Sequence, residues 1–196
     1  MSDNKNGSKY TFDSFAVTDA NRTAFEKAKQ FAENVDSKSL AIFGGTATGK
    51  THLLYAVKNA IEQNSPDLNV ILTTTADMVS SLTNIISNSG SAEQFREQYM
   101  QADILLVDDI QELAGKEAIQ NELILIFNSF YESGKRFMMT SSQKEAGYGI
   151  QDRLVIREFW GDFAIITRAY IHAQFEFNAE RINQRKDLLH KSEQLC

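Results

Sequence analysis

The sequence predicts an α/β fold of three layers, in which a five-stranded parallel sheet lies between two layers of helices. Short apolar runs suited to buried strands alternate with segments in which apolar residues recur every three or four positions, the spacing of one helix face. A glycine-rich motif follows the first apolar run directly and opens a helical segment. Alternating strands and helices of this kind pack as a parallel sheet with helices on both faces.

The first part of the chain supplies two strands and two helices. A cap at Thr18 or Asp19 predicts a helix that runs to about Glu33, with small and aromatic residues along one face. The next predicted elements are, in order, a strand over 37–43, a helix over 50–64 and a strand over 69–73.

The second part supplies the other three strands. Thr75 is predicted to cap a helix that ends before residue 88, and Ser91 with Gln94 forms a capping-box pattern for a short helix through Tyr99. Continuous apolar residues at 104–107 are typical of a strand buried on both faces. The remaining predicted elements are, in order, that strand over 103–107, a helix over 116–131, and strands over 136–140 and 162–167.

The glycine-rich motif reads GGTATGKT, a full match to the phosphate-loop pattern G-x-x-x-x-G-K-[ST]. Lys50 is expected to reach the β and γ phosphates, and the Thr51 hydroxyl to hold Mg²⁺. A chance glycine turn is the alternative, but a strand before the motif and a helix after it argue against that. The residues expected at a nucleotide in this three-layer P-loop fold are Gly44, Gly45, Thr46, Ala47, Thr48, Gly49, Lys50, Thr51 and the following His52.

Two carboxylates follow the strand over 103–107, at the end where ligands of open α/β sheets bind. Asp108 is the expected Mg²⁺ partner, and Asp109 is placed to polarise an attacking water. The alternative is a strand that ends in a solvated acidic turn. A phosphate loop in the same chain favours the catalytic interpretation.

Polar residues also follow the strand over 136–140. Ser142 and Gln143 can sense the γ-phosphate or orient a water molecule. A serine pair is equally common at the start of a turn, and both interpretations stay open at this point.

Composition narrows the classes of function. The 196 residues include 20 Lys and Arg against 26 Asp and Glu, so the net charge of −6 gives no overall basic field for nucleic acid. Cys196 is the single cysteine and excludes an internal disulfide framework. No apolar run approaches the ~18 residues of a membrane span, and residues 1–9 are polar and unlike a signal peptide. We therefore expect a cytoplasmic protein with no membrane partner and a flexible stretch over residues 1–9.

Four segments resemble one family. They are YTFDSF at 10–15 with Asn21, GGTATGKTHLL at 44–54, DDIQ at 108–111 with LAGKE at 113–117, and DRL at 152–154 with Arg157 and WG at 160–161. Together they resemble the AAA+ module of the bacterial chromosomal replication initiator DnaA, over roughly residues 10–170.

The resemblance implies roles beyond the phosphate loop. Arg157 would act in trans, on the γ-phosphate held by a neighbouring subunit; an ordinary surface arginine is the alternative. Four residues of the first segment would lie near the adenine, although they could equally serve as an aromatic anchor for the first helix. These four are Phe12, Phe15, Val17 and Asn21.

The chain also departs from the family. Gln143 stands where the family usually has an aspartate, and an amide cannot act as a base. Val79 and Lys116 resemble the motif that grips single-stranded DNA, but the family's nearby basic residue falls at Ala118. Residues 171–196 fit about one helix of the family's lid, over 178–194, and its duplex-binding helix-turn-helix domain has no counterpart. We therefore expect a truncated relative, with an AAA+ domain over 10–170 and at most a vestigial lid over 171–196.

These features leave several functions open. The resemblance favours an ATP-switched assembly protein of replication initiation, with ATP or ADP and Mg²⁺ as ligands and at most slow ATP hydrolysis. A regulator similar to Hda, acting on a full-length initiator, and a helicase loader are the alternatives. A housekeeping ATPase or kinase is disfavoured by the segment at 152–161. The expected partners are further copies, a full-length initiator or a helicase, with single-stranded DNA in addition and no sequence-specific duplex binding.

Overall fold

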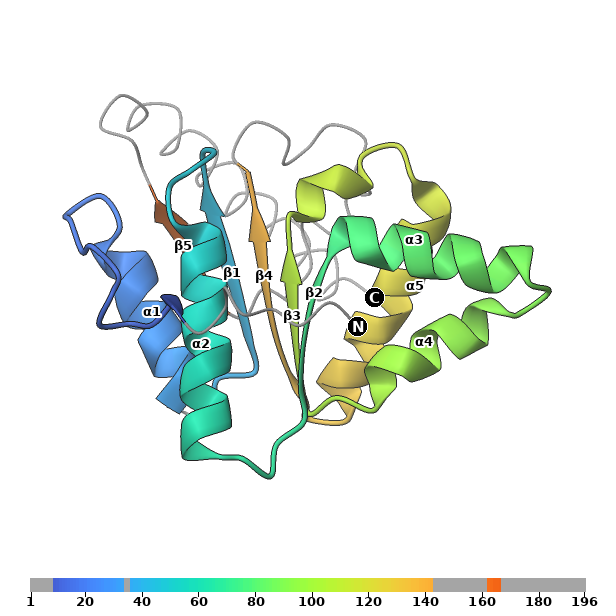
Figure 1. The fold of residues 1–196 in the computed structure, drawn as a ribbon, viewed down its shortest axis with the longest axis horizontal. Coiled ribbons are helices and arrows are strands. Elements are labelled where there is room, and N and C mark those ends of the chain that lie inside the picture. Colours follow the sequence, from blue (N-terminus) through green and yellow to red (C-terminus); the bar gives the residue numbers. More distant parts are fainter. Residues whose placement is uncertain (1–8, 34–35, 143–161, 167–196) are drawn as a thin grey trace, which may run out of the picture.

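The five strands form one parallel sheet in the order β2-β3-β4-β1-β5 (Figure 1). The computed structural model describes residues 9–33, 36–142 and 162–166. The strands are β1 Ser39–Gly44, β2 Val70–Thr74, β3 Ile104–Asp108, β4 Arg136–Ser141 and β5 Asp162–Ile166. Every pairing between neighbours is parallel. The predicted five-stranded parallel sheet is confirmed.

Helices cover both faces of this sheet, which gives the three layers seen in Figure 1. The helices are α1 Arg22–Glu33, α2 Lys50–Asn64, α3 Thr75–Ser87, α4 Ala92–Met100 and α5 Glu117–Glu132, with a short 3₁₀ turn η2 at Ile110–Leu113. Successive strand residues face opposite layers: Leu105 and Val107 of β3 pack with α3, α4 and α5, whereas Leu106 packs with α1 and α2. Both faces of the central strands are therefore buried, as their continuous apolar runs predict.

The helix starts differ from the predictions in three places. Thr74, and not Thr75, caps α3: Thr74 has extended backbone angles, and its side chain accepts a hydrogen bond from the N–H of Asp77. Helix α1 begins at Arg22, three residues after Asp19, and α5 begins one residue after Lys116. The capping box of Ser91 and Gln94 is confirmed, with both of its hydrogen bonds present.

The carboxyl ends of β1, β3 and β4 lie at the same edge of the sheet, so the phosphate loop, the aspartate pair and the serine pair meet there. The predicted helix over 178–194 and the residues Gln143 and Arg157 lie outside the described residues. In the part of the chain that the structure describes, no helix is long and apolar enough to cross a membrane.

Candidate nucleotide site

The phosphate loop connects the end of β1 to the start of α2. Gly49 precedes the helix with φ 97°, a left-handed conformation that a glycine adopts without steric cost. A Cβ on Gly49 would also lie 2.7 Å from a ring carbon of Phe15, so the position needs glycine for two reasons. The loop is folded on itself: the Thr48 hydroxyl donates to the Gly45 carbonyl at 2.8 Å.

Lys50 lies between the loop and the acidic end of β3. Its Nζ donates to the Gly45 carbonyl at 3.0 Å, and the residue is only 6% exposed. Burial lowers the pKa of Lys50, while the nearby carboxylates of Asp109 and Asp108 oppose that shift by favouring the ammonium. The structure therefore places one buried cation beside the loop that is expected to cradle phosphates.

Asp108 connects three elements at the end of β3. Its Oδ2 accepts a hydrogen bond of 2.7 Å from the Thr51 hydroxyl, 57 residues away in sequence, and its Oδ1 accepts from the Thr140 hydroxyl of β4. Thr75 of α3 donates from its hydroxyl to the Asp108 carbonyl at 3.2 Å. The two residues expected at Mg²⁺, Thr51 and Asp108, are thus in direct contact, and their oxygen atoms are the hard ligands that Mg²⁺ prefers.

Asp109 follows in an unusual backbone conformation. Its φ of 59° and ψ of 50° are left-handed, a region that a non-glycine residue enters at a cost. The Gln111 amide donates to Oδ1 of Asp109 at 2.8 Å, and the Gln111 side-chain oxygen accepts from the N–H of Ser142 at 2.8 Å. Asp109 and the first residue after β4 are therefore linked through Gln111.

The aromatic segment before α1 packs against the start of α2. Phe15 is buried, its ring stacks on Phe25 at 5.8 Å and meets the His52 ring edge-on at 5.0 Å. The His52 Nε2 donates to the Thr11 carbonyl at 2.9 Å, which fixes the segment to the helix. Phe12 also packs edge-on against Phe25, at 5.7 Å. The segment therefore covers one side of the phosphate loop and anchors α1 at the same time.

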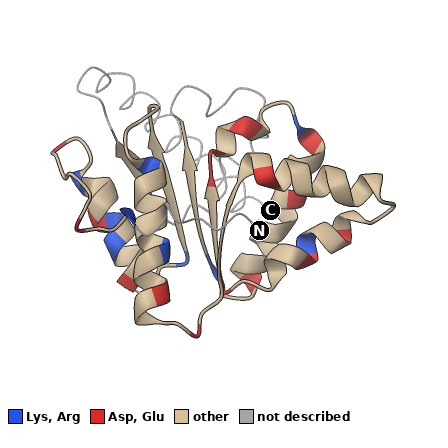
Figure 2. Cartoon of the chain, in the orientation of Figure 1, with Lys and Arg blue, Asp and Glu red and all other residues tan. Residues whose placement is uncertain are grey.

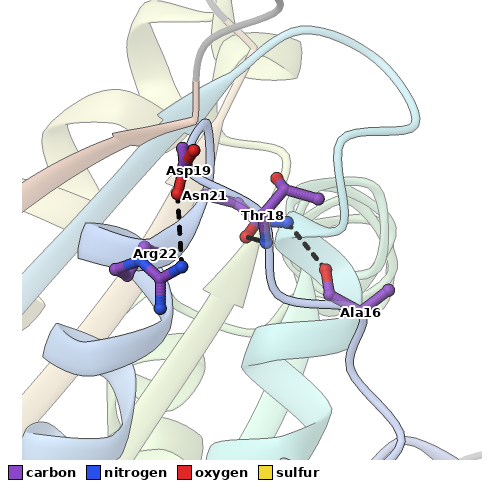
Figure 3. A network of polar contacts seen from close by, with 5 residues as sticks. All are labelled: Ala16, Thr18, Asp19, Asn21 and Arg22. Atoms are coloured by element: carbon purple, nitrogen blue, oxygen red, sulfur yellow. Dashed lines mark hydrogen bonds and ion pairs between the residues drawn. The ribbon is translucent and has the colours of Figure 1, made fainter.

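Asn21 and Val17, the other two residues expected near the adenine, differ in their burial. Asn21 is buried and serves the backbone: its Oδ1 accepts from the Thr18 N–H at 2.7 Å, and its Nδ2 donates to the Ala16 carbonyl at 3.0 Å (Figure 3). An ion pair between Arg22 and Asp19, 3.2 Å long, closes the same turn. Val17 is 38% exposed. The turn before α1 is thus held by its own polar residues.

A comparison with known families agrees with this geometry. A protein-family model described as the bacterial DnaA ATPase domain matches residues 6–164. The chain belongs to this family. The match spans the phosphate loop, both aspartates and strands β1 to β4, and it ends within β5, so the resemblance predicted from four short segments is confirmed over most of the chain.

Individual DnaA proteins are similar over the same region. The chain is 38% identical over 170 residues to the chromosomal replication initiator protein DnaA of Lactiplantibacillus plantarum, covering 85% of this chain and 37% of that protein. It thus spans little more than a third of the length of that relative. The crystal structure of domain III of DnaA from Thermotoga maritima matches with a TM-score of 0.76 and 37% identity, covering 81% of this chain and 67% of that one.

Two further structures help to decide between a DnaA-like protein and a helicase loader. A DnaA structure bound to AMPPCP and single-stranded DNA has a TM-score of 0.74 and 34% identity, covering 82% of this chain and 50% of that one. The DnaC helicase loader has a TM-score of 0.67 at 17% identity, covering 83% of this chain and 99% of that one, which is a likeness of fold alone. Sequence identity therefore places the chain with DnaA and not with the loader.

The residues that resemble the DnaA single-strand motif lie on neighbouring elements. Val79 of α3 is partly buried against the core that α3 shares with α5, and Lys116 is exposed just before α5. Ala118 is exposed in the first turn of α5. Helix α3 has no Lys or Arg, and Figure 2 shows no charged residue in its C-terminal half. Within the described residues, Lys116 is thus the cation that this motif retains.

Sequence reasoning missed the contribution of three polar residues to this candidate site. Thr75 and Thr140 donate hydrogen bonds to Asp108, and Gln111 holds Asp109. Thr140 and Gln111 had a usable signal, because Thr140 ends a predicted strand and Gln111 stands in the DDIQ segment at 108–111. Thr75 had none, since its sequence context predicted a helix cap.

Proposed function

We propose that this chain is an ATP-binding AAA+ protein of DNA replication initiation that uses ATP and Mg²⁺ as an assembly switch, with slow hydrolysis. The strongest support is the hydrogen bond of 2.7 Å between Thr51 of the phosphate loop and Asp108 of β3, with Lys50 buried beside both. The AMPPCP-bound DnaA of similar fold is consistent with a nucleotide at this place. The unit that binds it would be residues 10–170, with 171–196 as a partial lid.

Each part of the site has a proposed task. The N–H groups of the loop over 44–49 and the positive end of α2 would bind the phosphates, and the Lys50 ammonium would offset their charge. Thr51 and Asp108 would hold Mg²⁺, which neutralises phosphate charge when bound. Asp109 would accept a proton from, or orient, the attacking water. The adenine would lie against the segment that includes Phe12, Phe15, Val17 and Asn21, beside His52.

Titration calorimetry tests the central claim. We expect the chain to bind ATP and ADP, and to bind both more weakly when Mg²⁺ is removed with a chelator, because the metal offsets phosphate charge next to Asp108. Absence of binding of either nucleotide in the presence of Mg²⁺ would contradict the proposal.

ATP, and not ADP, is expected to drive self-association through Arg157. An arginine supplied in trans would contact a γ-phosphate that ADP lacks, so only the ATP state gains interface stability. A charge-assisted contact contributes about 1–3 kcal/mol, a tenfold or larger shift in association. Sedimentation velocity with each nucleotide measures the shift, and Arg157→Ala should remove it.

Two controls make this test decisive. Arg153→Ala tests the neighbouring arginine, and if that variant alone loses the ATP-dependent shift, Arg153 is the residue that acts in trans. Identical sedimentation of the wild type with ATP and ADP, alone and mixed with a full-length initiator, would exclude the switch. A pull-down from cell extract, with this chain as bait, separates the partner classes. Capture of an initiator would indicate an initiator-type or regulatory protein, and capture of a replicative helicase would indicate a loader.

We expect no useful affinity for duplex DNA at physiological salt. The net charge is −6 and Ala118 stands where the family resemblance implies a cation, so few phosphates can be neutralised. Weak binding of single strands would depend on Lys116, and Lys116→Ala should reduce it further. Fluorescence anisotropy with labelled duplex and single-stranded oligonucleotides measures both. Tight, sequence-specific duplex binding would show that a recognition element had been missed.

A further inference from the structure

We propose that Gln111 positions the carboxylate of Asp109 by tying it to the residue that follows β4. This inference rests on the proposed function, in which Asp109 polarises the attacking water. Gln111 acts through Asp109 and is a positioning residue, distinct from the groups that bind nucleotide or Mg²⁺.

The Gln111 side chain makes one hydrogen bond in each direction. Its Nε2 donates to Oδ1 of Asp109 at 2.8 Å, while its Oε1 accepts from the Ser142 N–H at 2.8 Å. Both distances are at the short end of the usual range for such bonds. Gln111 is 9% exposed, so water competes little for either partner. A side-chain amide can donate to a carboxylate and accept from a backbone N–H at the same time, whereas a carboxylate only accepts and an ammonium only donates.

The backbone around Asp109 explains why its carboxylate needs this support. The left-handed conformation of Asp109, with φ 59°, is unfavourable for a residue with a Cβ and persists only where the surroundings fix it. Its N–H donates to the Thr140 hydroxyl at 3.2 Å, which holds the backbone. The turn η2 places Gln111 between two buried anchors, Ile110 and Leu113. Thr140 therefore fixes the main chain of Asp109, and Gln111 fixes its side chain.

The bridge makes the orientation of Asp109 depend on the chain that leaves β4. The backbone N–H of Ser142 donates to Gln111, so a shift of Ser142 would be transmitted to the carboxylate. Water attack requires a well-placed carboxylate, and a displacement of about 1 Å can reduce turnover by roughly a hundredfold. Nucleotide affinity depends on the phosphate loop, which Gln111 does not contact by any hydrogen bond among the described residues. Loss of Gln111 should therefore reduce turnover and leave affinity unchanged.

Two substitutions separate the two hydrogen bonds. Gln111→Glu keeps an oxygen for the Ser142 N–H but has no donor for Asp109 at neutral pH, whereas Gln111→Met keeps the volume and loses both bonds. In single-turnover experiments both should hydrolyse ATP at least about tenfold more slowly, and in the uncharged variant Gln111→Met the Kd for ATP should stay within about twofold of the wild type. Amide hydrogen exchange at Ser142 should accelerate in Gln111→Met and stay slow in Gln111→Glu.

Gln94→Met is the matched control. It also removes a hydrogen bond that a backbone N–H donates to a glutamine oxygen, here from Ser91 at 3.1 Å in the capping box of α4. We expect it to lower the melting temperature and to leave turnover unchanged. Turnover within about twofold of the wild type in both Gln111 variants, or unchanged Ser142 exchange in Gln111→Met, would overturn the inference. A wild type that binds ATP without any turnover overturns this inference alone, whereas one that binds no ATP overturns the proposed function as well.

Discussion

Lys50→Ala is expected to abolish ATP binding at concentrations at which the wild type is saturated. Lys50 is 6% exposed as a residue and its Nζ donates to the Gly45 carbonyl at 3.0 Å, so its charge lies in a site largely shielded from water. Removing one member of a buried pair of opposite charges costs about 3–5 kcal/mol, which lowers affinity by a hundredfold or more. Titration calorimetry with ATP and Mg²⁺ measures the loss.

Lys58→Ala is the matched control for this substitution. Lys58 lies on the same helix, α2, but pairs with Glu62 one turn further on and away from the loop. Its removal should leave ATP affinity unchanged. If Lys50→Ala binds ATP as tightly as the wild type, the phosphates are bound elsewhere and the nucleotide site is misassigned.

Asp109→Asn is expected to leave ATP binding largely intact and to slow hydrolysis by about a hundredfold or more. The amide has the same shape, and its oxygen can still accept the hydrogen bond that Gln111 donates at 2.8 Å, so the turn should keep its geometry. What is lost is the negative charge that would polarise water. Single-turnover hydrolysis of labelled ATP measures the loss of hydrolysis, and the Kd for ATP shows whether binding is retained.

Asp103→Asn provides the comparison at the other end of β3. The Asp103 carboxylate accepts from the Asn69 N–H at 2.8 Å, far along the strand from the phosphate loop. Its loss should reduce stability slightly and leave hydrolysis unchanged. Hydrolysis that survives in Asp109→Asn would place the water-polarising role on another residue.

Much of the fold could be predicted because its signals are local. The apolar run at 104–107 and the helical spacing after Lys50 depend on near neighbours in sequence, and both elements form where predicted. The cap of α3 was misplaced by one residue, because Thr74 and Thr75 are equally good caps by composition. The extended backbone of Thr74 at the end of β2 decides between them, and that depends on the sheet.

The phosphate loop could be predicted from one continuous motif, but the way the site is held together could not. The bond from Thr51 to Asp108 joins residues 57 positions apart, and Gln111 reaches Ser142 over 31 positions. Such contacts depend on which strands become neighbours, here β3 beside β4 and β4 beside β1, and strand order does not follow from the periodicity of any segment. Gln111 in particular follows the left-handed residue Asp109, a backbone conformation that no local pattern predicts.

The contacts of Asp108 have a consequence for folding. Its carboxylate and carbonyl accept hydrogen bonds from α2, α3 and β4, so the end of β3 acquires its final form only when both sides of the sheet have assembled. A ligand that recognises this arrangement would bind the native chain and not a partly folded one. By mass action, a nucleotide present at a hundred times its Kd would then add about 2.7 kcal/mol to the free energy of unfolding. The nucleotide would then act as a structural component of the fold, and its concentration would contribute to the free energy of unfolding.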